Sequence, residues 1–299
     1  MRCIARRGTF GALAVVFWNY SRPASLAVSA FGLSTGRVNR NGNSSIRSAG
    51  HSSRRPLSLG SLASSGMETE PSVKSPPLKV LALHGSGGTA EEFPGRLVAL
   101  NEALAFYSSG GDDKKKTPLE LEITTVQAPF VKEDGFSWWT MPPGVRSFNA
   151  EEYTGFEESA KRVLDVWETG GFDIVLGHSQ GAILVGALLA MERTPYHPPG
   201  GYIMNGVSFP NPYSAELESL ERTNTVENNN DGSPEVLFLL GKRDKIAPNA
   251  TGEKLRDLLG QGGFRVSSCY HEGGHRFPQE DVGDEAMRTI VQWILQGRE

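Results

Sequence analysis

Short apolar runs with the composition of buried strands alternate with helical patterns along residues 78–299. The strand-like runs cover residues 78–83, 119–126, 172–176, 202–207, 236–240 and 264–270. The helical patterns cover residues 90–106, 152–169, 181–191, 254–259 and 286–295. Strands that alternate with helices predict an α/β domain whose mostly parallel central sheet has helices on both faces.

A Gly-His-Ser-Gln-Gly pentapeptide at residues 177–181 joins an expected strand to an expected helix. A serine hydroxyl is a weak nucleophile, so it must be exposed at a sharp turn beside a base. The glycines leave room for that turn, and the following helix offers free backbone N–H groups to a developing oxyanion. The pattern is that of the nucleophile elbow of α/β-hydrolases, with Ser179 as nucleophile. The alternative is a glycine-rich turn with an incidental serine.

A second glycine-rich loop, His-Gly-Ser-Gly-Gly at residues 84–88, directly follows the first expected strand. In α/β-hydrolases this early loop supplies one N–H group of the oxyanion hole. We therefore expect the backbone N–H groups of Ser86 and Gln180 to form that hole. A flexible glycine turn is the alternative, and the loop lacks the spacing and the lysine of a phosphate-binding loop.

The acid and the base of a catalytic triad are expected to follow the nucleophile in the order Ser, Asp, His. Asp244 lies just after the expected strand 236–240, where the acid belongs, although a solvated turn would also suit it. His271 and His275 compete for the base, and we favour His275 because a glycine pair before it can fold it back over Ser179. The same glycines oppose a helix that would put both histidines on one metal-binding face, so no metal site is expected.

Two longer excursions, residues 128–150 and 210–233, interrupt the pattern and are expected to be loops over the active face. Trp138 and Trp139 fall in the first excursion, where they are candidates for the wall of an acyl pocket. Two aromatic residues that pin the loop to the core are an equal alternative. His178, inside the pentapeptide, is expected to pack and to point away from the nucleophile.

Residues 1–66 contain nine Arg and many Ser but no Lys, Asp or Glu, a composition typical of an organelle presequence. A basic start, an apolar run over 8–18, Val-Ser-Ala at 28–30 and then Phe31 resemble the bipartite plastid presequences of algae with secondary plastids. Mitochondrial import, or a cytoplasmic or nuclear protein with a disordered tail, is the alternative. The expected organisation is thus a removable presequence 1–66, a linker 67–77 and one hydrolase domain 78–299.

The charge of the remaining chain excludes several partners. Nine of the 30 basic residues lie in 1–66, which leaves 21 against 34 acidic residues and a net charge of −13 for residues 67–299. Such a body repels nucleic acid and anionic lipid. No apolar run in the sequence is long enough for a membrane span, so stable insertion is not expected. Cys269 has no second cysteine in this body to form a disulfide with.

Taken in order, these motifs resemble the FSH serine hydrolases, an α/β-hydrolase family that includes the ovarian cancer-associated gene 2 protein and fungal and plant relatives. The resemblance spans nearly all of residues 78–299. It is carried by residues 81–85, 137–139, 153–159, 172–177, 179–182 and 273–275, with Gly241, Asp244, Pro248 and Pro278. The chain departs from the family at His178, where an aromatic residue is commoner, and at Lys242, where an acidic residue is commoner. The resemblance implies hydrolysis of carboxylic esters or thioesters, with little or no lid domain and no cofactor.

A small-molecule ester or thioester of short to medium acyl chain length is therefore the expected substrate. Acyl-protein and lysophospholipid thioesterases, which also have Ser-Gln-Gly at the elbow, are the alternative within enzymes. A non-catalytic receptor that keeps the fold to bind a small molecule is the alternative outside them. The presence of Ser179, Asp244 and His275 together favours an enzyme.

Overall fold

The computed structural model describes residues 75–110, 117–223, 232–278 and 285–297, which all lie in one compact unit, Met67–Glu299. The expected presequence 1–66 and residues 67–74 of the expected linker lie outside the described residues.

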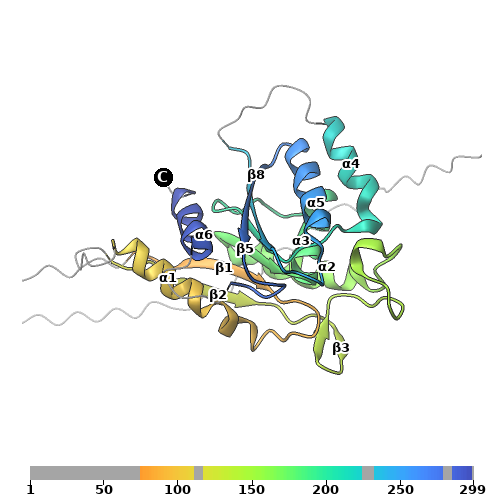
Figure 1. Ribbon diagram of the computed structural model, residues 1–299, viewed down its shortest axis with the longest axis horizontal. Helices are drawn as coiled ribbons and strands as arrows, with labels where there is room; N and C mark the ends of the chain where they lie inside the picture. Colours follow the sequence, from red (N-terminus) through yellow and green to blue (C-terminus); the bar gives the residue numbers. More distant parts are fainter. Residues whose placement is uncertain (1–74, 111–116, 224–231, 279–284, 298–299) are drawn as a thin grey trace, which may run out of the picture. The chain divides into compact units, whose positions relative to one another are not determined.

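Six parallel strands form the central sheet in the order β2-β1-β5-β6-β7-β8 (Figure 1). The strands are β1 (Leu78–Leu83), β2 (Leu121–Thr125), β5 (Ile174–His178), β6 (Tyr202–Asn205), β7 (Glu235–Gly241) and β8 (Arg265–His271). Every residue of β5 and β6 is buried, because these inner strands have helices on both faces. The edge strands β2 and β8 are only partly buried, which explains their mixed composition.

The helices form a layer on each face of the sheet (Figure 1). On one face lie η1 (Phe93–Leu97), α1 (Val98–Ser108) and α6 (Glu285–Gln296), whose apolar residues share a core cluster with Val80 and Ile174. On the other face lie α2 (Phe156–Gly170), α3 (Gln180–Ala190), α4 (Ser214–Thr223) and α5 (Asn249–Gln261). The predicted three-layer α/β arrangement is therefore confirmed.

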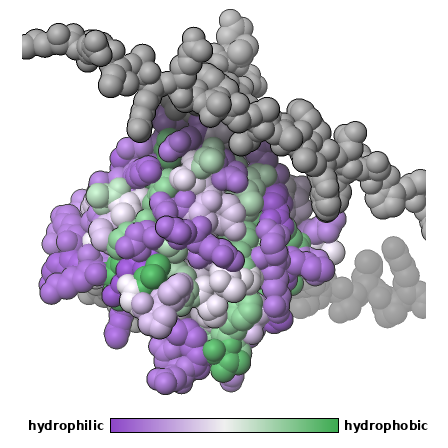
Figure 2. All heavy atoms as spheres, turned by 90° about the vertical axis from the view of Figure 1, so that its right-hand side faces the viewer, coloured by the Kyte–Doolittle hydropathy of each residue, from purple (hydrophilic) through white to green (hydrophobic). Residues whose placement is uncertain are grey.

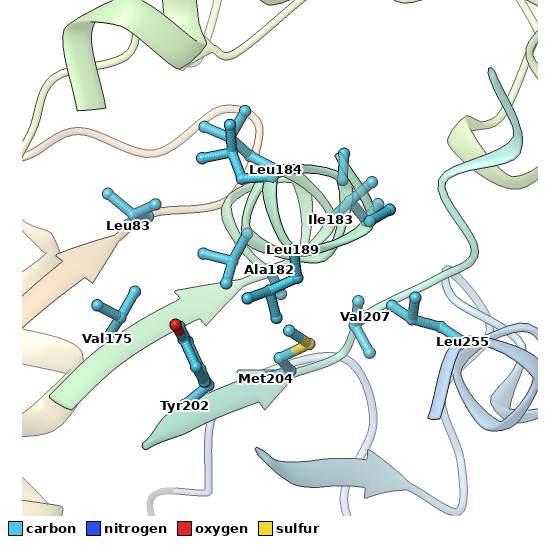
Figure 3. Close-up of a cluster of buried hydrophobic side chains, with 14 of the residues drawn as sticks. Leu83, Val175, Ala182, Ile183, Leu184, Leu189, Tyr202, Met204, Val207 and Leu255 are labelled. Atoms are coloured by element: carbon cyan, nitrogen blue, oxygen red, sulfur yellow. The ribbon is translucent and has the colours of Figure 1, made fainter. Parts of the chain in front are cut away.

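Helix α3 occupies the middle of the second layer. All of its residues are buried, and Figure 3 shows its Ala182, Ile183, Leu184 and Leu189 among side chains from β1, β5, β6 and α5. A helix that is apolar all round needs such surroundings. Since α3 begins directly after Ser179, this packing fixes the position of the expected nucleophile.

Both excursions contain regular structure that was not expected. Residues 128–150 include the antiparallel strands β3 (Phe130–Lys132) and β4 (Gly135–Ser137) and the short helix η2 (Ser147–Asn149). The hairpin is at the lower edge of Figure 1, and Figure 2 shows hydrophobic beside hydrophilic surface along that edge. Its Val131 is 78% exposed.

The second excursion includes η3 (Asn211–Tyr213) and α4, so the prediction of a loop over residues 210–223 is wrong. Helix α4 buries Leu217 and Leu220 against the α3–α5 layer, and this tertiary packing stabilises a segment whose own apolar pattern is weak. Among the described residues, no helix combines the length and apolarity needed to cross a membrane.

Candidate active site

Ser179 stands at a sharp turn between β5 and α3, with φ 52° and ψ −118°. A positive φ is costly for a residue with a side chain, so surrounding contacts must enforce it. The Ser179 N–H donates to the Asn205 carbonyl oxygen at 2.9 Å, which ties the turn to the end of β6. The side chain is thereby presented at the carboxyl edge of the sheet.

Glycine is required at both ends of this turn. A Cβ atom on Gly177 would lie 2.5 Å from the Ala182 Cα, and a Cβ on Gly181 would lie 2.4 Å from the Leu83 carbonyl oxygen. Both obstacles are backbone atoms, which cannot move aside as a flexible side chain can. The spacing of the two glycines thus follows from the close approach of α3 to β1 and β5.

The structure brings Ser179, His275 and Asp244 into one chain of hydrogen bonds. His275 Nε2 lies 2.7 Å from Ser179 Oγ, and His275 Nδ1 lies 2.7 Å from Asp244 Oδ2. With Asp244 ionised, Nδ1 carries the proton donated to Oδ2, which leaves Nε2 to accept from the serine hydroxyl. The Asp244 side chain is 1% exposed and that of His275 is 14% exposed.

Asp244 is held as an anion by its surroundings. Burial alone raises the pKa of its carboxyl group, but hydrogen bonds from His275 and from the N–H groups of Ala247 and Ile246 outweigh burial and keep the pKa below its usual range. The two N–H groups donate to Oδ1 at 2.9 and 2.8 Å. The carboxylate can therefore orient His275 at neutral pH.

The ends of β7 and β8 are joined in a way that explains why His275, and not His271, meets Ser179. The N–H groups of Lys242 and Arg243 donate to the carbonyl oxygens of His271 and Gly273, at 2.9 and 3.0 Å. His271 stays at the strand end, where its Nδ1 accepts the Gly273 N–H at 3.2 Å. The glycine pair carries the chain back over the sheet edge, where His275 Nε2 reaches Ser179 Oγ.

The loop at residues 84–88 is fixed by the β3–β4 hairpin. The Gly87 N–H donates to the Phe136 carbonyl oxygen at 2.8 Å, and the Phe136 N–H donates to that of Gly88 at 3.0 Å. Within the described residues, the Ser86 N–H makes no such bond, and the first N–H groups of a helix such as that of Gln180 have no acceptor in the helix. Ser86 and Gln180 line the same cavity as Ser179 and His275.

His84 anchors the start of this loop, a role that the sequence analysis did not identify. Its Nε2 accepts the Ala128 N–H at 3.2 Å, so Nδ1 is the protonated nitrogen and donates to the Gly85 carbonyl oxygen at 2.7 Å. Burial lowers the pKa of His84 against the opposing effect of the bond to Gly85, so the ring is neutral. The position of His84 directly after the first strand is the sequence signal that could have identified this role.

Trp138 and Trp139 do not line the cavity, so their predicted role as its wall is wrong. Both are buried, at 0% and 1% exposure. Trp138 donates from Nε1 to the His84 carbonyl oxygen at 2.7 Å and from its N–H to Gln180 Oε1 at 3.0 Å. Trp139 stacks on Tyr153 with ring centroids 4.2 Å apart. Both residues instead pin the excursion to the core, which is the alternative that the sequence analysis left open.

His178 is buried in the elbow, as expected, but its ring lies beside the ring of His275, with centroids 5.2 Å apart. Asn205 Nδ2 donates to His178 Nδ1 at 2.8 Å. Burial, with a smaller contribution from His275, lowers the pKa of His178 to about 3. His178 is therefore a neutral packing partner of the triad at physiological pH.

The cavity beside Ser179 has a volume of about 230 Å³. Besides the residues already named, its lining consists of apolar Met141, Val145, Phe148, Ile183, Ile246 and Ala247, cationic Lys132 and Arg146, and Ser147, Gly206 and Ser208. Several of these belong to the excursion 128–150, where no sequence pattern singled them out. Among the described residues, no cluster of three or more His, Cys, Asp or Glu side chains could hold a metal ion.

Comparison with known proteins yields consistent matches. A family model described as "Serine hydrolase (FSH1)" matches residues 73–287. Esterase C25G4.2 of Caenorhabditis elegans is 26% identical over 226 residues, 73% of this chain and 94% of that esterase. Esterase OVCA2 of Danio rerio is 28% identical over 230 residues, 68% of this chain and 91% of that esterase. Among solved structures, Arabidopsis thaliana SOBER1 is similar in fold, with a TM-score of 0.51 and 17% identity over 75% of this chain and 100% of SOBER1.

Proposed function

The chain belongs to the FSH1 serine hydrolase family, and on that premise we propose that it cleaves carboxylic esters or thioesters of short to medium acyl chain length through an acyl-enzyme on Ser179. It is a hydrolase that acts on esters, with the α/β-hydrolase fold. The observation that carries the proposal is the unbroken hydrogen-bond chain from Ser179 Oγ through His275 to the buried Asp244.

The geometry supports the following sequence of events. Ser179 Oγ attacks the carbonyl carbon while His275 Nε2 takes the hydroxyl proton, and Asp244 stabilises the imidazolium that results. The backbone N–H groups of Ser86 and Gln180 bind the oxyanion. His275 then gives the proton to the departing alcohol or thiol, which leaves an acyl group on Ser179. A water molecule, activated by His275 in the same way, releases the carboxylic acid and restores the serine.

The cavity supports the proposed range of acyl chains. Its volume of about 230 Å³ is small for a ligand site, and its side chains Met141, Val145, Phe148 and Ile183 offer apolar contact. A short or medium hydrocarbon chain fits these dimensions better than a long one.

Labelling with a fluorophosphonate probe tests the proposal and separates an enzyme from a receptor of the same fold. The probe should modify wild-type protein at Ser179, and Ser179→Ala should abolish both labelling and hydrolysis of a 4-nitrophenyl butanoate reporter. Ser219→Ala is the matched control, since Ser219 lies on α4 and, among the described residues, its hydroxyl donates only to the Glu216 carbonyl oxygen. Folded wild-type protein that is neither labelled nor active would contradict the proposal.

We further propose that residues 1–66 direct the protein to a plastid or mitochondrion and are removed on import. The support is their Arg- and Ser-rich composition without acidic residues. Sequencing the N-terminus of the protein from its native source should find a start near residue 67. An intact Met1 in the mature protein would contradict this proposal.

A further inference from the structure

The cavity at Ser179 is lined by two cationic side chains, Lys132 and Arg146, and by no acidic side chain within the described residues. Asp244 is buried behind His275 and does not line it. This is unexpected on composition alone, because residues 67–299 have 34 acidic against 21 basic residues. The local charge of the cavity is thus opposite to that of the body around it.

Lys132 is positioned by the β3–β4 hairpin. It ends β3, and its Nζ donates to Ser86 Oγ at 3.0 Å. This puts the ammonium group beside the loop at residues 84–88, the oxyanion loop. Asp134 offers only a contact of 4.0 Å and is itself largely exposed, so it neutralises little of this charge. The positive charge of Lys132 is therefore available to a bound ligand.

Arg146 is positioned by the segment that follows. Its N–H donates to Asn149 Oδ1 at 3.0 Å, and the segment is anchored where the Tyr153 hydroxyl donates to the Ser147 carbonyl oxygen at 2.8 Å. Asn211 Nδ2 holds the Ala150 carbonyl oxygen at 2.9 Å. Arg146 lines the cavity, and its guanidinium makes no hydrogen bond or ion pair with any described residue, so its donors are free to bind a ligand.

We propose that the substrate is an ester or thioester that carries a carboxylate away from the reacting carbonyl, and that Lys132 and Arg146 bind this carboxylate. This inference rests on the function proposed above and specifies its substrate class. A guanidinium binds a carboxylate through two parallel hydrogen bonds, and a lysine adds a point charge. A carboxylate is small enough for a cavity of about 230 Å³, and its two oxygens can accept from both cations. The apolar side chains that line the same cavity contact the hydrocarbon part.

Two pairs of thioesters test the proposal, with thiol release measured colorimetrically in each case. The first pair is the S-ethyl thioester of adipic acid with its second carboxyl group free or methylated, which puts the charge on the acyl side. The second pair is S-butanoyl-3-mercaptopropionate and its methyl ester, which puts the charge on the leaving group. Within each pair the two members differ by one methyl group and by the negative charge that this methyl group removes, so a preference for the smaller, charged member that depends on the two cations measures the recognition of charge.

Wild-type enzyme should prefer the charged member of at least one pair by on the order of tenfold to a hundredfold, since the two cations are partly exposed to water. The double variant Lys132→Gln, Arg146→Gln should bring that ratio close to one, because kcat/KM falls far more for the charged member than for the neutral member of a pair. Arg146→Lys should keep part of the preference, because it retains the positive charge but loses the two parallel N–H donors of the guanidinium. The matched control Lys161→Gln, Arg162→Gln removes two cations from the exposed face of α2 and should keep the full ratio.

Three results would overturn the inference. They are a wild-type ratio of one or less in both pairs, a ratio that survives in the double variant, or an equal loss for charged and neutral substrates, which would assign Lys132 to the oxyanion loop alone. Arg146→Gln, at an exposed side chain, repeats the test if the double variant does not fold. Failure of the proposed function looks different: no probe releases thiol and Ser179 is not labelled.

Discussion

Two regions form the candidate active site: the loops that carry Ser179, Asp244 and His275, and the excursion 128–150, which walls the cavity. They are held in place by different interactions. The first are fixed by backbone contacts so close that only glycine fits, and by the buried Asp244. The excursion is held by the hydrogen bonds of its hairpin to the loop at residues 84–88, by buried Trp138 and by the bond of Asn211 to the Ala150 carbonyl oxygen, and its Lys132 and Arg146 remain exposed. On the function proposed above, reactivity depends on the sheet edge, whereas substrate choice depends on a segment attached to it.

The largest expected effect comes from the sheet-edge loops. His275→Ala should lower kcat by on the order of 10⁴ or more, as should Ser179→Ala, and the double variant should be hardly worse than either, because the triad acts as one unit. His271→Ala should keep most activity. Steady-state kinetics on the butanoate reporter check this; an inactive, folded His271→Ala beside an active His275→Ala would reverse our assignment of the base.

The steric argument for the elbow is tested by stability. Gly181→Ala puts a Cβ against the Leu83 carbonyl oxygen and should destabilise the fold by about 3 kcal/mol or more. Gly186→Ala is the matched control on the same helix, where the new Cβ meets only the movable end of Leu255 and should cost little. Urea unfolding of both variants measures the difference. Equal midpoints for the two would show that the elbow has more room than its glycines indicate.

Replacing the anchor of the excursion should have an intermediate effect. Trp138→Phe leaves the buried His84 carbonyl oxygen without its donor, at a cost of about 1–3 kcal/mol, and should also lower kcat by loosening the oxyanion loop. Trp139→Phe is the control, since the Trp139 Nε1 has no acceptor among the described residues. Thermal melting and kcat are the measurements. If Trp139→Phe proved the more damaging of the two, the anchoring role given to Trp138 would be wrong.

Strain at the nucleophile predicts a smaller and opposite effect. At φ 52° glycine is far less strained than alanine, so Ser179→Gly should be more stable than Ser179→Ala by about 1 kcal/mol, although both are inactive. On helix α4 the order should reverse, with Ser219→Ala more stable than Ser219→Gly. Denaturant midpoints of the four variants decide the matter, and the same order at both sites would argue against strain at Ser179.

The smallest expected effect is on the stability of the protein at acidic pH. Because the folded-state pKa of Asp244 is depressed, its carboxylate contributes stability that is complete above the unfolded-state pKa of about 3.9 and is lost as pH falls through the folded value. The melting temperature of wild-type protein should therefore exceed that of Asp244→Asn at pH 7, and the gap should narrow below about pH 4. A gap that stays constant down to pH 3 would mean that the carboxylate gains nothing on folding.

The difference between the two regions also explains what the sequence revealed. The meeting of Ser179, Asp244 and His275 could be predicted because each of them follows an expected strand, and the carboxyl ends of parallel strands lie at one edge of the sheet. The β3–β4 hairpin could not, since its strands pair over three residues each and are completed by a distant partner, Gly88. Helix α4 could not be predicted either, because it is stabilised by the contacts of Leu217 and Leu220 with distant parts of the chain. No local sequence pattern shows those contacts.

The double attachment of the cavity wall has a consequence for how this enzyme can diverge. Trp138 fixes one end of the wall and Ala150 the other, and the residues between them contribute Met141, Val145, Arg146 and Phe148 to the cavity. Mutation can therefore alter or lengthen that intervening stretch while the elbow and the triad keep their geometry. A lineage with this fold can acquire new substrates by small changes at one short segment, without passing through inactive ancestors.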